Sequence, residues 1–321
     1  MKRIITWVKP TWNGMHIGNY FWAIVPFLKV AEWKEAYLFI ADYHSLTSVH
    51  DKKTMEQNKF NLMCEYFALV PESSNVVIFE QSSVKRINDF AWILSSVTPY
   101  SLMLRAHSFK DAQAKNSDIN MAVFNYPILM AADILAYDID IVPVGKDQTQ
   151  HLEFARDIAG NFNNTFGEIL KLPEAYIEKE GETILGIDGR KMSKSYNNFI
   201  PLFGSEKEIK KVIMSIVTDD TPLEAPKNPD TCNVFAFIKM FANKEKQEEI
   251  RQKYLAGNYW YWHAKLELLE IYLDYFKEAR EKYDLFQKYP EELYKKLEIW
   301  NQKANALADK KFAQLKSAVW L

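Results

Sequence analysis

Two lysines flank a small hydroxyl residue at residues 191–195, which read Lys-Met-Ser-Lys-Ser. A lysine ammonium can approach a triphosphate as a compact point charge, and a serine hydroxyl can donate a further hydrogen bond to it. Gly186, Gly189 and Asn197 lie close by, which predicts a loop around this segment. A solvated basic loop is the alternative interpretation, but a chance match to all five letters in a chain of this length has odds of about 10⁻⁴. The segment therefore favours a triphosphate site.

A second segment that could bind phosphate, residues 10–20, lies between an expected strand and an expected helix. The amino terminus of a helix presents free N–H groups and a positive dipole end, which suit a phosphate. His16 and Asn19 offer hydrogen-bond donors there, and Gly18, which has no side chain, leaves room for a flat adenine ring. A histidine at a helix start is more often a cap or a surface residue. This segment therefore supports a phosphate site mainly in combination with residues 191–195.

A third group, Tyr126, Met130 and Asp133, is spaced at i, i+4 and i+7, which places the three side chains on one helix face. A carboxylate on such a face can accept a hydrogen bond from an N–H group of an aromatic ligand. The Met130 side chain would give a polarizable apolar wall for the ring. The alternative interpretation is a core stripe with one surface acid, and for an isolated stripe it would be the better one. The sequence around the stripe decides between them.

The first half of the chain predicts a framework that could hold these groups. Strands are expected at residues 3–8, 37–42, 75–80 and 140–144, and helices from about residue 16 and at residues 51–69, 89–97, 126–137 and 147–162. Strands that alternate with helices of this length predict an α/β fold with a doubly wound, Rossmann-like parallel sheet. Ligands of such folds bind at the carboxyl ends of the strands. These ends are residues 8–14, 42–44 and 144–148.

The chain after about residue 185 has a different pattern. A loop over residues 186–198 precedes a region with almost no strand signal, in which helices are separated by residues 222–232, 243–246, 257–258 and 289–290. We therefore expect a catalytic domain over residues 1–195 and an all-helical domain over residues 196–321. The last helix of the second domain could pack back on the first.

The composition excludes several kinds of protein. The chain of 321 residues is 48% hydrophobic, which is enough for two cores, and no apolar run approaches the ~20 residues that span a bilayer. Its apolar start is too short for a signal peptide, so we expect a cytoplasmic protein. Two distant cysteines, Cys64 and Cys232, exclude a disulfide framework and a four-cysteine zinc or iron–sulfur site. A net charge of −2 confines any nucleic-acid contact to a local patch.

The best local basic patch is the strip over residues 300–321. It holds Lys303, Lys310, Lys311 and Lys316 against a single acid, Asp309. A solvated helix face is the default interpretation of such a strip. A surface that contacts a nucleic acid is the functional interpretation.

The first two segments together resemble the signature pair of the class I aminoacyl-tRNA synthetases. His-Ile-Gly-Asn at residues 16–19 is similar to the first signature as it occurs in the tryptophan and tyrosine branch, and residues 191–195 match the second without change. Residues 126–137 and 140–151 resemble the tryptophan-specific members. Met130 stands where the tyrosine-specific members commonly have a glutamine that holds a phenol oxygen. The resemblance is strong up to about residue 200 and again at residues 303–308.

The resemblance implies a reaction and its participants. We expect the protein to activate L-tryptophan with ATP and Mg²⁺ and to transfer tryptophan from the adenylate to tRNA(Trp), whose anticodon the helical domain over residues 196–321 would bind. We also expect a homodimer with no protein-bound zinc or iron–sulfur cluster and no membrane partner. Catalysis is assigned to Lys191, Lys194, His16 and Asn19. ATP binding is assigned to Lys9, Thr11, Gly18, Asn19, Gly145, Asp147, Lys191, Met192, Ser193, Lys194 and Ser195. Tryptophan binding is assigned to Ile5, His44, Tyr126, Met130, Asp133, Val142, Val144 and Gln148.

The sequence departs from the family pattern near the expected phosphates. The first signature loop is one residue longer, with Trp-Asn-Gly at residues 12–14, and Trp7 and Lys9 replace a usual glycine and a usual glutamine. Ala112 stands where a second lysine is common, and Lys115 is a candidate to replace it.

The sequence also allows two other functions. One is a tyrosyl-tRNA synthetase. The other is a non-catalytic paralogue that binds RNA or a regulator. The intact signatures argue against the paralogue, because a binding module has no need of phosphate donors in both loops.

Overall fold

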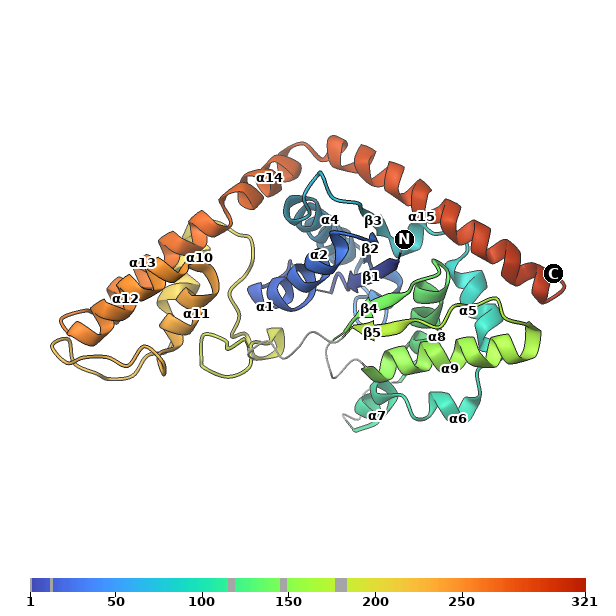
Figure 1. Cartoon of the computed structure of the whole chain (residues 1–321), viewed down its shortest axis with the longest axis horizontal. Helices are drawn as coiled ribbons and strands as arrows, with labels where there is room; N and C mark the ends of the chain where they lie inside the picture. The colour runs from blue at the N-terminus through green and yellow to red at the C-terminus, as the bar shows by residue number, and fades with distance from the viewer. Residues whose placement is uncertain (1, 12–13, 115–118, 145–148, 177–183) are drawn as a thin grey trace. The chain divides into compact units, whose positions relative to one another are not determined.

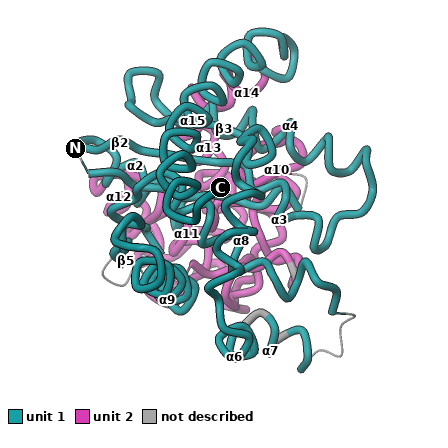
Figure 2. Tube along the Cα trace, turned by 90° about the vertical axis from the view of Figure 1, so that its right-hand side faces the viewer, with its two compact units in different colours: residues 1–13, 22–180, 286–321 teal, residues 14–21, 181–285 magenta. Residues whose placement is uncertain are grey.

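The structure is a computed structural model that describes residues 2–11, 14–114, 119–144, 149–176 and 184–321 (Figure 1). The side chains of His107, Ser108, Asp111 and Ser195 lie outside the description. The chain forms two compact units (Figure 2). Unit 1 contains residues 1–13, 22–180 and 286–321, and unit 2 contains residues 14–21 and 181–285. The units are therefore discontinuous in sequence, whereas the sequence pattern suggests a single boundary after residue 195.

Unit 1 is built on a five-stranded parallel sheet with the order β3-β2-β1-β4-β5. The strands are β1 (Arg3–Val8), β2 (Glu35–Ile40), β3 (Val76–Glu80), β4 (Ile141–Pro143) and β5 (Glu174–Tyr176). Consecutive residues of β1, β2 and β3 are buried, as expected for strands covered on both faces. The predicted α/β fold is confirmed. The strand order reverses between β1 and β4, and this switch point is where ligands of such sheets bind.

Helices make up most of the rest of unit 1. They are α2 (Val25–Ala31), α3 (Asp42–Ser45), α4 (Lys52–Leu69), α5 (Ile87–Ser95), α6 (Tyr100–Met103), α7 (His107–Ala114), α8 (Met121–Leu135), α9 (Thr149–Phe166) and α15 (Pro290–Ala318), with a 3₁₀ turn, η2 (Gln81–Ser83). α8 packs against α5 and α9, and α15 packs against β3. Asp51 caps α4 by accepting the Thr54 N–H at 2.8 Å. Tyr37, Phe39, Phe79 and Tyr137 form an aromatic cluster within the core.

α15 presents one buried face to unit 1. Its buried residues follow a spacing of three and four and are Leu293, Leu297, Asn301, Ala304, Ala308, Lys311 and Leu315. We call this row of buried residues the seam of α15. Two of its members, Asn301 and Lys311, are polar. Lys311 donates to the Ile169 carbonyl and forms an ion pair with Asp138. Lys311 therefore does not belong to a solvent-facing basic strip, although Lys303, Lys310 and Lys316 are exposed.

Unit 2 is helical. It contains α1 (Ile17–Asn19), a 3₁₀ turn η4 (Lys194–Tyr196), α10 (Glu206–Met214), α11 (Asn233–Phe241), α12 (Lys244–Ala256) and α13 (Tyr261–Tyr275). The chain passes from unit 2 to unit 1 within the π-helical segment η1 (Tyr20–Ile24), and does so a second time within α14 (Lys277–Lys288). α13 packs against α10 and α11, and Phe241, Tyr272 and Phe276 contact one another in its core. Within the described residues, no helix has the length and apolar character needed to cross a bilayer.

Candidate active site

A cavity of about 260 Å³ opens in unit 1 near the carboxyl end of β1. Its walls come from the end of β1, from the turn after β2, and from α8 and α9. The lining residues are Trp7, Lys9, His44, Thr47, Val123, Tyr126, Met130 and His151. The cavity thus lies beside the switch point of the sheet, and its size is close to the lower end of the ~300–1,000 Å³ range of small-ligand pockets. It suits one small molecule.

Aromatic rings shape this cavity. Trp7 stacks on Phe39 with ring centroids 5.4 Å apart, so the departure from the usual glycine contributes to the wall. Tyr126 meets His44 and His151 edge to face at centroid distances of 5.8 and 5.7 Å. The Tyr126 hydroxyl lies 2.6 Å from His151 Nε2, which fixes the orientation of both side chains. A planar apolar ligand would find ring faces and edges on several sides.

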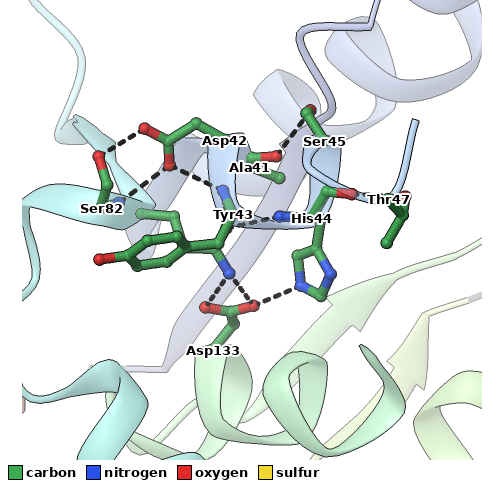
Figure 3. Close-up of polar contacts among 9 residues, drawn as sticks. Ala41, Asp42, Tyr43, His44, Ser45, Thr47, Ser82 and Asp133 are labelled. Carbon is green, nitrogen blue, oxygen red and sulfur yellow. Dashed lines mark hydrogen bonds and ion pairs between the residues drawn. The ribbon is translucent and has the colours of Figure 1, made fainter. Parts of the chain in front are cut away.

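Asp133 lies next to the cavity wall, one helical turn beyond Met130, and is almost fully buried. His44 Nε2 is 2.8 Å from Asp133 Oδ2, and the Gln81 amide donates to Oδ1 and Oδ2 at 2.9 and 2.8 Å. Figure 3 shows Asp133 and His44 pointing toward each other. Burial raises the pKa of the Asp133 carboxyl, and the hydrogen bonds from His44 and Gln81 oppose that rise. An ionised Asp133 requires the proton of His44 on Nε2.

The Asp133 carboxylate can accept one more donor. Oδ2 takes two of the contacts described and Oδ1 takes one, while each carboxylate oxygen offers two lone pairs. Met130, which is buried and apolar, lies on the same helix face. A buried acceptor beside an apolar aromatic pocket favours a ligand that carries an N–H or O–H group at one edge of a ring, because a ligand without a donor would shield the remaining lone pair from water and leave it without a hydrogen bond.

Gln81 was not predicted from sequence as a site residue. Its Oε1 accepts the backbone N–H groups of Tyr43 and His44 at 3.1 and 3.4 Å, so its amide nitrogen must face Asp133. Gln81 follows β3 directly, in a sheet where polar residues at the carboxyl ends of strands were expected to form the site. That position was the signal that could have found it.

A second polar cluster supports the turn that carries His44. Asp42 Oδ1 accepts the N–H groups of Tyr43 and Ser82 at 3.1 and 3.0 Å, as Figure 3 shows. Lys59 pairs with Asp42 and Glu80 at 2.7 and 2.8 Å. This network ties the carboxyl end of β2 to that of β3. It therefore holds the two segments that place His44 and Gln81.

The remaining residues predicted to bind tryptophan lie as follows. Ile5 and Val142 are buried in the core, and Val144 packs against it. Gln148 lies outside the described residues, as do Gly145, Asp147 and Lys115. Four lining residues were not predicted as site residues: Trp7, Thr47, Val123 and His151. Val123 precedes Tyr126 by three residues on α8, so the helical spacing could have identified it.

Among the described residues, two of those predicted to bind ATP, Lys9 and Thr11, belong to unit 1. Lys9 lines the cavity, and the surrounding protein atoms lower the pKa of its ammonium by desolvating it, although its side chain remains accessible to solvent. The Thr11 N–H donates to the Lys9 carbonyl at 2.8 Å, which forms a tight turn after β1. A cation therefore stands at the edge of the aromatic pocket.

The two predicted phosphate segments lie side by side in unit 2. Backbone hydrogen bonds join Ile17 to Ile200 and Met15 to Leu202, at 3.1 and 2.9 Å. The Lys194 ammonium donates to the Gly14 carbonyl at 2.7 Å. The structure thus brings the first signature, near residue 16, next to the second, at residues 191–195, as their chemistry requires.

His16 is held by a reciprocal cap. Its Nδ1 accepts the Asn19 N–H, and its own N–H donates to Asn19 Oδ1, both at 3.2 Å. Burial, with the charge of Lys194 in addition, lowers the pKa of His16 to about 4. The ring is therefore neutral at pH 7, and because Nδ1 is an acceptor its proton is on Nε2. This tautomer can donate a hydrogen bond to a phosphate oxygen.

Residue 18 must lack a side chain because the His16 ring occupies the space beside it. A Cβ at residue 18 would lie 2.8 Å from His16 Cε1 and Nδ1 and 3.3 Å from the Met192 sulfur. A side chain there would displace the ring from its capping position. In this structure the open side of Gly18 thus accommodates a catalytic candidate and a residue of the second signature, whereas the sequence interpretation gave that space to adenine.

Residues around the second signature anchor it. The Met192 side chain is buried, and Asn198 accepts the Ser193 N–H at 2.8 Å while its amide donates to Asp188 and to the Lys191 carbonyl at 2.7 and 3.1 Å. Lys191 itself is exposed. The anchors hold the backbone of the segment, and the Lys191 side chain extends to solvent from it.

Comparisons with known proteins cover the whole chain. The family model "tRNA synthetases class I (W and Y)" matches residues 2–277. A tryptophan–tRNA ligase of Fusobacterium nucleatum is 46% identical over 322 residues, which is 100% of this chain and 98% of the relative. One from Campylobacter jejuni is 44% identical over 319 residues, covering 99% of this chain and 100% of the relative.

Solved structures agree with these relatives. The crystal structure of Campylobacter jejuni tryptophanyl-tRNA synthetase complexed with ADP and tryptophan has a TM-score of 0.95 and 44% identity, and covers 99% of this chain and 100% of that chain. The tyrosyl-tRNA synthetase of Archaeoglobus fulgidus complexed with L-tyrosine has a TM-score of 0.63 at 17% identity, with coverages of 88% and 90%, and shares the fold alone.

Proposed function

This chain belongs to the class I tRNA synthetases of the tryptophan and tyrosine family, and we infer from its pocket that it is a tryptophan–tRNA ligase. It activates L-tryptophan with ATP and transfers the amino acid to tRNA(Trp). The observation that carries this conclusion is the Asp133 carboxylate, buried beside an aromatic cavity with the apolar Met130 on the same helix face. The names of its full-length relatives support the same substrate.

Tryptophan binds with its indole ring in the cavity. The indole N–H donates to Asp133, while His44 and Gln81 hold the carboxylate from the other side. Met130 and Tyr126 contact the ring. Met130 also disfavours tyrosine, because a phenol oxygen needs both a donor and an acceptor partner when it is buried, and a thioether is at best a weak acceptor.

ATP binds as its Mg²⁺ complex. The described residues hold no cluster of three His, Cys, Asp or Glu side chains suited to a metal ion. Mg²⁺ usually keeps several waters and binds through substrate phosphates. We assign the magnesium ion to the substrate and not to a cage of protein ligands. Gly145 and Asp147 are assigned to ATP, and Gln148 to tryptophan.

The first step joins the two substrates. A carboxylate oxygen of tryptophan attacks the α-phosphorus and forms the new O–P bond, while the bond from that phosphorus to the bridging oxygen breaks and pyrophosphate leaves with the electron pair. Neutral His16 donates from Nε2–H, Asn19 donates from its amide, and Lys191 and Lys194 offset the growing negative charge. Lys9 neutralises charge at the edge of the tryptophan pocket.

The second step releases the amino acid to RNA. A ribose hydroxyl at the 3′ end of tRNA attacks the carbonyl carbon of the adenylate, and AMP leaves. We assign tRNA contacts to the helical residues after 196, with exposed Lys303, Lys310 and Lys316 on α15 as part of the surface. Lys311 is left out of it, because it is buried against Asp138 and Ile169.

The protein acts as a homodimer in the cytoplasm. Large apolar side chains are exposed on unit 1 at Trp92 (79%), Tyr100 (69%) and Met121 (66%), on α5, α6 and α8. α8 packs against both α5 and α6, so these side chains belong to one helical layer. Such side chains are the kind that a subunit interface covers. Sedimentation of the purified chain should show a mass of two copies, and a monomer would contradict this assignment.

Amino-acid-dependent exchange of pyrophosphate into ATP tests the substrate directly. Each of the twenty amino acids is supplied in turn, with Asp133→Asn as the matched variant. Tryptophan should support exchange in the parent protein far better than any other amino acid. Preference for tyrosine would make the chain a tyrosyl enzyme. Exchange with none of them would identify a non-catalytic paralogue.

A further inference from the structure

Two asparagines of α15 bond to the backbone on either side of Gln81. Asn301 Oδ1 accepts the Glu80 N–H at 3.1 Å. Asn305 Oδ1 accepts the Lys85 N–H at 3.0 Å, and its amide donates to the Ser83 carbonyl at 2.8 Å. Glu80 precedes Gln81, and the other two follow it. The short segment 80–85 is therefore held by side chains that lie more than 200 residues away in sequence.

The opposite side of this segment faces the tryptophan pocket. Gln81 is buried, and its side chain reaches from η2 to the Asp133 carboxylate. Among the described residues, His44 is the other donor to the Asp133 carboxylate. An unbroken series of contacts thus runs from α15 through segment 80–85 and Gln81 to Asp133. All of these residues belong to unit 1.

The seam of α15 shows why asparagine stands there. Leucine and alanine fill most of its buried positions, yet Asn301 is only 8% exposed. A buried amide is destabilising unless it is hydrogen-bonded, and a buried polar residue in an apolar helix seam fixes the register of the helix. Leucine at this position would preserve the apolar packing and lose the register. Asn305, which is half-buried, adds a second attachment four residues later and also donates to the Asn301 carbonyl at 2.9 Å.

We propose that Asn301 and Asn305 are positioning residues for tryptophan: through the backbone of segment 80–85 they set the Gln81 amide against Asp133 and so orient the acceptor for the indole N–H. The terminal helix thereby takes part in amino-acid recognition without touching the ligand. This inference rests on the proposed assignment of the cavity to tryptophan.

The test is steady-state pyrophosphate exchange on Asn301→Leu, Asn305→Leu and the double variant. Each single change should raise KM for tryptophan about 3- to 10-fold, the effect of a lost hydrogen bond, and the double change should raise it further. KM for ATP and kcat should stay within about twofold, since phosphate binding does not use this segment. Asn305→Asp keeps the acceptor for Lys85 at a half-buried position and should recover part of the loss.

Lys311→Met is the matched control, because it removes the other buried polar group of the same seam. It should lower the melting temperature and leave KM for tryptophan within about twofold. Asparagine variants that behave like this control, or that raise KM for ATP as much as KM for tryptophan, would overturn the inference. Asp133→Asn is measured alongside them. If it leaves KM for tryptophan unchanged, the pocket assignment fails; if it raises KM and the asparagine variants do not, only the positioning role fails.

Discussion

The proposed tryptophan pocket and the proposed phosphate segments are built in opposite ways. In the pocket, the functional carboxylate of Asp133 is buried and already holds two partners, His44 and Gln81. In the phosphate segments, Asn198 and Met192 anchor the chain while Lys191 is exposed and Lys194 bonds to a backbone carbonyl. Rigid placement serves discrimination between similar side chains, because a preorganised acceptor loses little on binding the correct ligand. The exposed Lys191 side chain can follow a triphosphate that must enter, react and leave as pyrophosphate.

Lys194→Ala should have the largest effect. Removing a group that offsets charge in the transition state costs about 10²–10³ in rate, so adenylate formation should slow by about that factor while tryptophan affinity stays within about twofold. Single-turnover formation of the adenylate measures this. Arg190→Ala is the control, because Arg190 lies four residues earlier and pairs with Asp188 in its own loop. Adenylate formation at the parent rate in Lys194→Ala would remove this lysine from the mechanism.

Asp133→Asn should have the second-largest effect on the reaction. It replaces one carboxylate oxygen with an amide that faces the donors His44 and Gln81, so both the ligand bond and its support are weakened. Loss of a hydrogen bond to a charged acceptor corresponds to about 10- to 150-fold in kcat/KM for tryptophan, with KM for ATP unchanged. Exchange kinetics with each substrate varied in turn provide the measurement. A decrease of less than threefold would show that Asp133 is not the indole acceptor.

His16 should lower the free energy of unfolding as the pH falls. Its pKa is lowered to about 4 in the folded chain, while in the unfolded chain it is about 6.5. The unfolded state therefore binds the proton first, and His16 reduces stability as pH falls from about 6.5 toward 4, by about 2 kcal/mol between pH 7 and 5. His16→Asn, which keeps a capping side chain, should lose less stability over this range. Equal pH dependence of urea unfolding in both proteins would contradict the buried, neutral ring.

Exposed lysines on α15 should give the smallest effect. Changing Lys303, Lys310 and Lys316 together to glutamine should weaken tRNA binding a few-fold and flatten its dependence on salt, because fewer counterions are released. Pyrophosphate exchange with tryptophan should be unaffected. Charging assays over a salt series compare the triple variant with the parent. An unchanged slope would place the tRNA contacts elsewhere among the helical residues.

Regular patterns made much of the fold predictable. β1 has the predicted bounds, and the helix after Asp51 ends at Leu69 as expected. β5 was missed because its three residues are exposed and carry no apolar alternation. α8 begins at Met121, five residues before the predicted start, because the pattern was taken from the apolar stretch alone. Local periodicity thus located the long elements, but it missed the short strand β5 and the start of α8.

The site residues that could be predicted are likewise those that local spacing relates. Tyr126, Met130 and Asp133 could be grouped because helix geometry relates them locally. The contact of Gln81 with Asp133 and the burial of Lys311 against Asp138 join residues far apart in sequence, and no local spacing encodes such pairs. The basic strip on the last helix was overestimated for this reason.

Discrimination against a ligand that lacks the indole N–H tests the central claim most directly. The tryptophan analogue in which sulfur replaces the ring nitrogen keeps the shape of the side chain and removes its donor. Binding of tryptophan and of this analogue to the parent and to Asp133→Asn is measured by calorimetry. The parent should prefer tryptophan by about tenfold or more, and the variant should lose most of that preference. Equal preference in both proteins would contradict the account, because the N–H would then be recognised without Asp133.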